Sequence, residues 1–209
     1  MGIFNRSSTK SVAYHIRVNI LGNSGIGKSS LLMSYMKGHY VPIETPTIHE
    51  QYKLLVRYGN CHLALSINDS SGMPLNRSVR RYNYKNADVF IVCYAVDNPE
   101  SFNDLPKWIR EIRSTVGYVP IVLVALKDDL RNDVVIEEKL ESEGENIVTF
   151  KRGKAMARKL KVHSYCECSS LYSAVRFFLH SIFIATFIHC RNSPKGTLAH
   201  MSLRGRGWD

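Results

Sequence analysis

A glycine-rich segment near the start of the chain constrains its fold more than any other feature. Residues 22–29 read Gly-Asn-Ser-Gly-Ile-Gly-Lys-Ser, which fits the pattern G-x-x-x-x-G-K-[ST]. A β-rich run at residues 15–21 precedes it, and a helical stretch at residues 28–37 follows it. In a strand–loop–helix unit of this kind, glycines let backbone N–H groups turn towards phosphate oxygens at a helix N-terminus. This context favours a phosphate-binding loop over a glycine-rich turn that binds nothing.

Two positions in this loop and one further turn predict a site for a nucleotide with Mg²⁺. Lys28 would reach the β- and γ-phosphates, and Ser29 would offer its hydroxyl to the metal. The predicted strand at residues 61–69 ends in Asp69-Ser70-Ser71-Gly72, where a carboxylate can hold Mg²⁺ through water and a glycine N–H can meet a γ-phosphate. The expected phosphate and metal contacts are therefore Gly22, Ser24, Gly25, Ile26, Gly27, Lys28, Ser29, Ser30, Asp69 and Gly72.

The order of apolar segments predicts an α/β fold. Strand and helix patterns alternate, which favours a mostly parallel sheet covered on both faces. Residues 87–96 and 120–126 are continuous apolar runs, typical of strands buried on both faces. The strand at residues 61–69 should form a hairpin with residues 48–58. Between the two apolar runs, Asp97 or Asn98 is a candidate cap for a helical pattern that contains Phe102, Leu105, Ile109 and Ile112.

Composition restricts the classes of partner. The 209 residues carry 44% hydrophobic and 22% charged residues, as one soluble domain does, with a net charge of +10. A basic surface can serve nucleic acid, an anionic membrane or solubility alone, and the sequence has no aromatic-interleaved nucleic-acid motif. We expect no nucleic-acid partner. The start of the sequence has no apolar signal region, and the five cysteines favour a reduced cytoplasmic protein, with a peripheral position at membranes left open.

Three further segments extend the pattern of the phosphate loop. They are residues 46–48 (Pro-Thr-Ile), 125–129 (Ala-Leu-Lys-Asp-Asp) and 167–170 (Glu-Cys-Ser-Ser). With these motifs the chain resembles the Ras superfamily of small GTPases over about residues 13–190, and within it an atypical member of the Rho branch. The resemblance implies a G domain with a six-stranded, mostly parallel sheet and helices on both faces. It also implies GTP or GDP with Mg²⁺ as ligand.

The same resemblance assigns roles to single residues. Thr47 looks like the switch residue that binds Mg²⁺ and senses the γ-phosphate, which makes Ser29, Thr47 and Asp69 (through water) the metal site. For the guanine base the resemblance implies a ring contact from Tyr40, recognition by Lys127 and Asp129, bracing of Asp129 by Ser169, and a backbone contact from Ser170. The charged stretch at residues 133–145 resembles the insert helix of the Rho branch. Residues 1–12 would then be an N-terminal extension and residues 191–209 a basic tail.

Two positions that act in hydrolysis differ from the family pattern. Ser24 stands where the family usually has glycine in the phosphate loop, and Met73 stands where it has the glutamine that orients the attacking water. A thioether cannot donate a hydrogen bond. With Thr47, these residues form the predicted catalytic set, and the sequence favours slow hydrolysis with the GTP-bound form prevailing. A conventional regulated GTPase, in which another residue places the water, remains the first alternative.

Other departures bear on the base and on partners. Leu126 and Leu171 replace residues that support guanine binding in the family, which keeps open a second alternative, a scaffold that has lost the switch. By resemblance, the switch regions would contact effectors in actin organisation, polarity or trafficking, together with exchange factors and activating proteins. The sequence ends without a Cys-a-a-X box, while Gly2 and Cys190 are candidate lipidation sites beside an uncharged helical pattern at residues 177–190.

Overall fold

One six-stranded sheet organises the fold. The computed structural model describes residues 13–43, 49–58, 61–70 and 77–171. Its strands are β1 (Ala13–Leu21), β2 (His49–Tyr58), β3 (Cys61–Ser70), β4 (Val89–Ala95), β5 (Ile121–Leu126) and β6 (Ser164–Cys168), in the order β2-β3-β1-β4-β5-β6. The predicted α/β fold with a six-stranded, mostly parallel sheet is confirmed.

The pairing of the strands fixes where loops gather. Strands β2 and β3 pair antiparallel, with Tyr58 opposite Cys61, as the predicted hairpin requires. The other pairs, β3–β1, β1–β4, β4–β5 and β5–β6, are parallel. Their carboxyl ends therefore lie along one edge of the sheet. The strand order also reverses between β1 and β4, which is where open α/β sheets bind ligands.

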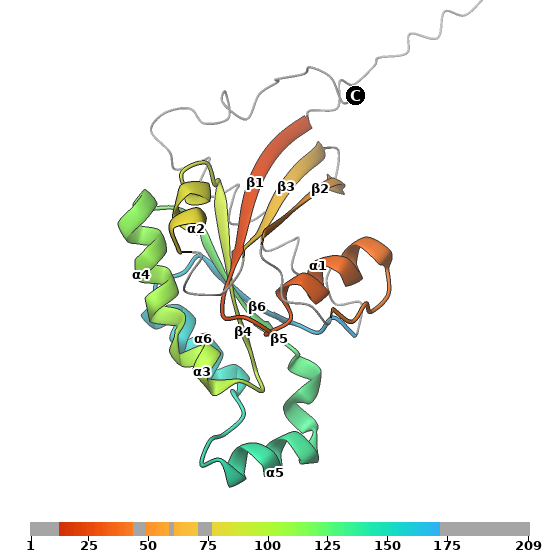
Figure 1. Cartoon of the computed structure of the whole chain (residues 1–209), viewed down its shortest axis with the longest axis vertical. Helices are drawn as coiled ribbons and strands as arrows, with labels where there is room; N and C mark the ends of the chain where they lie inside the picture. Colours follow the sequence, from red (N-terminus) through yellow and green to blue (C-terminus); the bar gives the residue numbers. More distant parts are fainter. Residues whose placement is uncertain (1–12, 44–48, 59–60, 71–76, 172–209) are drawn as a thin grey trace, which may run out of the picture.

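Helices cover both faces of the sheet (Figure 1). Helix α1 (Lys28–Lys37) lies on one face, and α2 (Arg77–Tyr84), α4 (Leu105–Val116) and α6 (Phe150–Lys159) lie on the other. Each face has its own apolar cluster, and β4 contributes Ile91 and Cys93 to one and Phe90 and Val92 to the other. Because both faces of β4 are buried, its sequence is continuously apolar.

The helical pattern between β4 and β5 divides into two helices. Helix α3 (Pro99–Asn103) begins at the cap Asn98, whose side chain accepts a hydrogen bond from the Ser101 backbone N–H at 2.8 Å. The chain turns at Asp104 before α4 starts. Pro106 in the first turn of α4 has no N–H to continue the hydrogen bonding of α3, which explains why one periodic pattern gives two helices.

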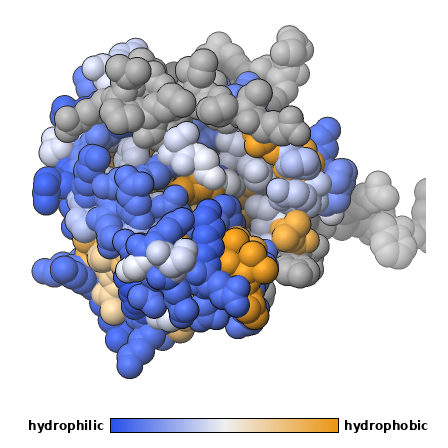
Figure 2. Space-filling view, turned by 60° about the horizontal axis from the view of Figure 1, so that its bottom comes forward, coloured by the Kyte–Doolittle hydropathy of each residue, from blue (hydrophilic) through white to orange (hydrophobic). Residues whose placement is uncertain are grey.

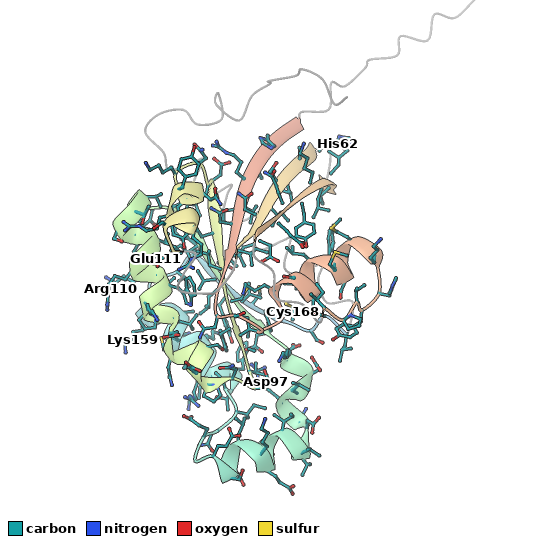
Figure 3. The ribbon with its side chains drawn as sticks, in the orientation of Figure 1. His62, Asp97, Arg110, Glu111, Lys159 and Cys168 are labelled. Atoms are coloured by element: carbon teal, nitrogen blue, oxygen red, sulfur yellow. The ribbon has the colours of Figure 1, made fainter. Side chains whose placement is uncertain are left out.

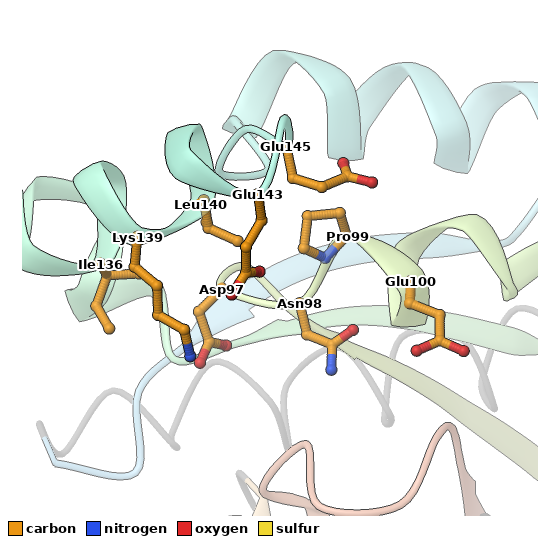
Figure 4. Close-up of a pocket in the computed structure, with 9 residues that line it drawn as sticks. All are labelled: Asp97, Asn98, Pro99, Glu100, Ile136, Lys139, Leu140, Glu143 and Glu145. Atoms are coloured by element: carbon orange, nitrogen blue, oxygen red, sulfur yellow. The ribbon is translucent and has the colours of Figure 1, made fainter.

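A short 3₁₀ helix, η2 (Asp128–Asn132), and helix α5 (Val134–Ser142) follow β5. Helix α5 lies within the charged stretch predicted to be helical. Its cap Asp133 accepts hydrogen bonds from the Val135 and Ile136 backbone N–H groups at 3.0 and 3.3 Å. A cleft of about 320 Å³ separates α5 from the start of α3 (Figure 4) and is lined by Asp97, Asn98, Pro99, Glu100, Ile136, Lys139, Leu140, Glu143 and Glu145.

Several predicted features fall outside the described residues. They are the extension at residues 1–12, the helical pattern at residues 177–190, the tail at residues 191–209, and Gly2, Thr47, Gly72, Met73 and Cys190. Within residues 13–43, 49–58, 61–70 and 77–171, no helix combines the length and apolar character that a membrane crossing requires. The face of the molecule seen in Figure 2 is mostly hydrophilic, with small separate apolar areas.

Candidate nucleotide site

The phosphate loop is built around glycines with backbone conformations that side chains disfavour. Gly22, Gly25 and Gly27 have φ angles of +140°, +74° and +101°. At Gly22 there is also no room for a Cβ, because it would meet the backbone carbonyl of Cys93 on β4. The loop therefore lies directly against the sheet, and helix α1 begins after Gly27 without a side-chain cap. This leaves the first N–H groups of α1 available for an anion.

Lys28 lies inside the loop that it follows. Its ammonium donates hydrogen bonds to the carbonyl oxygens of Gly22 at 3.0 Å and of Asn23 at 2.7 Å. The side chain is almost completely buried, and this burial lowers the pKa of Lys28, while the nearby Asp69 carboxylate opposes the shift. A buried ammonium beside turned backbone N–H groups is the donor set that a phosphate requires.

A hydroxyl and a carboxylate meet where β3 ends. Ser29 Oγ donates a hydrogen bond to Asp69 Oδ2, although the two residues are 40 positions apart in the sequence. The parallel pairing of β1 and β3 brings this about, since Ile20 stands opposite Asp69. Asp69 is fully buried. An oxygen pair of this kind suits Mg²⁺, which binds to carboxylate and hydroxyl groups beside phosphates.

The two segments predicted for the base come to the same edge of the sheet. Lys127 follows β5 in a left-handed conformation, with φ of 57°, and its ammonium forms an ion pair with Asp97 Oδ2 at 2.8 Å. Its Cε would lie 4.0 Å from a Cβ placed on Gly27, so its stem passes over the phosphate loop. Asp129 lies in η2, next along the chain.

The segment after β6 completes this edge. Ser169 is buried, and its hydroxyl accepts a hydrogen bond from the Leu171 backbone N–H at 3.0 Å. The bracing of Asp129 by Ser169, and the base contact of Ser170, stay predictions. Tyr40 follows α1 in an exposed segment, and its side chain is 44% exposed. Ile26 is buried beneath the loop, while Ser24 is exposed on it, and Ser30 lies partly buried in α1.

Several side chains that support the site were not predicted from the sequence. Asp97 pairs with Lys127 from the end of β4. Arg131 of η2 forms an ion pair with Glu167 of β6, including a hydrogen bond of 2.7 Å from Nη2 to Oε1, and its Nε donates to the Val148 carbonyl at 3.0 Å. These contacts join residues 17 to 36 positions apart, for which periodicity gives no signal.

Leu126 belongs to the core. It is 2% exposed and belongs to the apolar cluster shared with α1. A polar residue here could reach the phosphate loop, whereas a leucine contributes apolar packing instead. Next to Leu126, the Lys127 ammonium is held by its ion pair with Asp97.

The comparisons with known proteins agree with this geometry. The Ras family model matches residues 17–183. The chain is 36% identical over 152 residues to the GTP-binding protein rho1 of Schizosaccharomyces pombe, which covers 72% of this chain and 75% of that protein. It is 34% identical over 156 residues to the Rho-related GTP-binding protein RhoD of Homo sapiens, covering 74% of each.

The family-model match covers most of β1, all of β2 to β6, the phosphate loop and the segments predicted to bind the base. Proteins of the Ras and Rho families bind GTP or GDP with Mg²⁺ and act as signalling switches that contact effectors, exchange factors and activating proteins. The chain therefore belongs to the Ras superfamily of small GTPases, in its Rho branch.

Proposed function

We propose that this Rho-branch protein hydrolyses GTP slowly, so that its GTP-bound form prevails and presents the switch regions to effectors. The observation that carries the proposal is the replacement of two hydrolytic positions, by Ser24 and Met73. The phosphate loop, which contains Ser24, keeps Lys28 and Ser29, so we expect nucleotide binding to be retained while hydrolysis is slow.

The backbone conformation at position 24 accommodates serine in place of the family's glycine. Among the described residues, only Lys127 and Lys161 combine a side chain with a positive φ, so Ser24 has no left-handed strain. Its side chain is exposed at the loop surface. A side chain there takes up space that the arginine finger of an activating protein would share with the attacking water, and that finger is worth about 10³–10⁵ in rate.

Met73 lies outside the described residues, so its role rests on chemistry. The family glutamine both donates and accepts hydrogen bonds and can orient water, whereas a thioether is only a weak acceptor. Positioning of the attacking group supplies much of the acceleration in phosphoryl transfer. Replacing the glutamine therefore removes the group that positions the attacking water. Ser24 independently hinders the approach of that water.

We infer that the nucleotide is held by groups whose geometry fits it. Lys28 and the backbone N–H groups at the start of α1 would hold the phosphates, Ser29 and Asp69 would hold Mg²⁺, and Lys127 with Asp129 would hold the base. Held by Ser29 and Asp69, Mg²⁺ would neutralise the negative charge that develops on the phosphates during hydrolysis. Thr47 and Tyr40 complete the proposed set.

One observation favours a second candidate, a scaffold in which nucleotide turnover has no role. Leu126 is committed to the apolar core and offers no polar group to the phosphate loop. Without that polar group, the protein would bind the guanine base more weakly. Actin organisation, polarity and trafficking stay proposals under either candidate.

Single-turnover hydrolysis tests the proposal. Protein loaded with radiolabelled GTP is compared with Ser24→Gly, Met73→Gln and the double variant, with each rate normalised to nucleotide actually bound. We expect slow hydrolysis that an activating protein accelerates less than tenfold, and at least tenfold faster hydrolysis in the double variant. A wild-type rate equal to that of the double variant would exclude the proposal, and failure of all four proteins to retain GTP would favour the scaffold.

A further inference from the structure

A line of side-chain contacts joins the phosphate loop to α2 by way of α4. It begins at Asn23, whose side-chain oxygen accepts a hydrogen bond from the indole Nε1–H of Trp108 at 2.9 Å. The Asn23 side-chain nitrogen donates to Asp104 Oδ2, also at 2.9 Å. Both partners belong to the start of α4. The loop is therefore fixed to α4 through both polar atoms of one amide.

The ring of Trp108 is held from its other side by α2. The guanidinium carbon of Arg80 lies 4.9 Å from the ring centroid, within the range of a cation–π contact. Arg80 and Trp108 are 4% and 6% exposed. This contact is shielded from water, so it is stronger than the same contact on a surface.

Arg80 is itself anchored on α4. Its Nη2 lies 3.4 Å from Glu111 Oε1, and the hydroxyl of Tyr84, also on α2, donates to the same oxygen at 2.8 Å. Figure 3 shows Glu111 on the inner side of α4, while its neighbour Arg110 points outward. A buried ion pair is costly to separate because each charge is then left without its partner. Displacement of α2 would therefore disturb Arg80 and Trp108 together.

The hydrogen bond from Trp108 to Asn23 depends on the orientation of the indole ring. Trp108 has a single N–H donor, and the orientation of its ring decides whether that donor points at Asn23. Arg80 restricts the orientation by covering one ring face. The orientation of this donor therefore depends on the position of α2, which carries Arg80.

We propose that Trp108 is a positioning residue that couples α2 to the phosphate loop. While α2 is docked through Arg80, Trp108 holds Asn23 and the loop retains its nucleotide. A protein partner that displaces α2 withdraws this support and speeds nucleotide release. The coupling concerns nucleotide retention and does not depend on whether hydrolysis is slow.

Release of fluorescently labelled GDP from the full chain, with Mg²⁺ present, tests the coupling without any hydrolysis step. Trp108→Phe keeps an aromatic ring for Arg80 but lacks the N–H donor. Arg80→Lys keeps a charge for Glu111 but loses the planar guanidinium. We expect each variant to release GDP roughly three- to tenfold faster. Trp108→Phe loses one buried hydrogen bond, and Arg80→Lys weakens the shielded guanidinium–indole contact that orients it. Arg80→Lys should add little once Trp108 is replaced. Arg110→Lys, on the exposed side of α4, is the matched control.

Three results would overturn the proposal. Arg80→Lys could release GDP at the wild-type rate, which would make Trp108 a local support of the loop. The two effects could multiply, which would make them independent. The variants could also lower the unfolding temperature with unchanged release, which would make the role structural.

If Arg80→Lys fails to fold, a spectroscopic measurement tests the coupling between α2 and the phosphate loop instead. The indole N–H resonance of Trp108, assigned by its loss in Trp108→Phe, should shift in Tyr84→Phe, which weakens the α2–α4 contact at Glu111. GDP release should be faster in the same variant. An unmoved resonance with wild-type release would refute the coupling.

Discussion

Replacement of Arg131 by alanine should destabilise the fold, because it leaves the Glu167 carboxylate without its cation. Arg131 joins η2 to β6 through its ion pair with Glu167, and the two side chains are only 19% and 12% exposed. Without Arg131, the Glu167 carboxylate keeps the hydrogen bond from Tyr165 but loses its cation. The Val148 carbonyl loses its donor as well.

The magnitude follows from this burial. Breaking one partner out of a buried ion pair costs about 3–5 kcal/mol, and because the pair retains some contact with water we take the lower end, about 3 kcal/mol. For a domain of this size each kcal/mol lowers the unfolding temperature by about 2–4 °C. We therefore expect Arg131→Ala to lower it by about 6–12 °C.

Thermal unfolding measured by circular dichroism gives the comparison, with nucleotide and Mg²⁺ held constant because bound ligand raises the unfolding temperature. The double variant Arg131→Met/Glu167→Gln should recover part of the loss, since it removes the uncompensated charge. Arg110→Ala, on the exposed side of α4, should change the unfolding temperature little. A drop of less than 2 °C in Arg131→Ala would refute the reasoning.

Three further predictions concern the phosphate loop and the core. Gly22→Ala should abolish nucleotide retention, measured on the purified protein, because its Cβ meets a β4 carbonyl, while Gly38→Ala, with a positive φ but open space, should retain nucleotide. Burial raises the pKa of the Cys93 and Cys168 thiols, so both should resist alkylation at pH 8 until the protein unfolds; peptide mapping that finds either labelled in the native state contradicts this. Chelation of Mg²⁺ should speed release of labelled GDP, and unchanged release would contradict a metal site at Ser29.

Local patterns were sufficient to predict most of the fold. The phosphate-loop motif placed a strand and a helix around residues 22–29, and α1 has the predicted bounds. Continuous apolar runs identified β4 and β5, because strands buried on both faces have no polar side. The division of α3 from α4 was not predicted, although Pro106 carried the signal.

Such local patterns could not predict most contacts between residues that lie far apart in the sequence. The motif predicted that Ser29 and Asp69 share a site, and the structure joins them. By contrast, nothing in the sequence around Trp108 indicates that it donates to Asn23, 85 positions away. Such pairs depend on the strand order and on how α4 crosses the sheet, so they emerge only once the elements are in place.

The nucleotide that the protein carries on purification tests the central claim most directly. The protein is isolated without added nucleotide, precipitated, and the released nucleotide is identified by chromatography, alongside the Ser24→Gly/Met73→Gln variant as control. Slow hydrolysis predicts mostly GTP from the wild type and a shift towards GDP in the variant. Mostly GDP from the wild type would contradict the account and indicate a conventional switch.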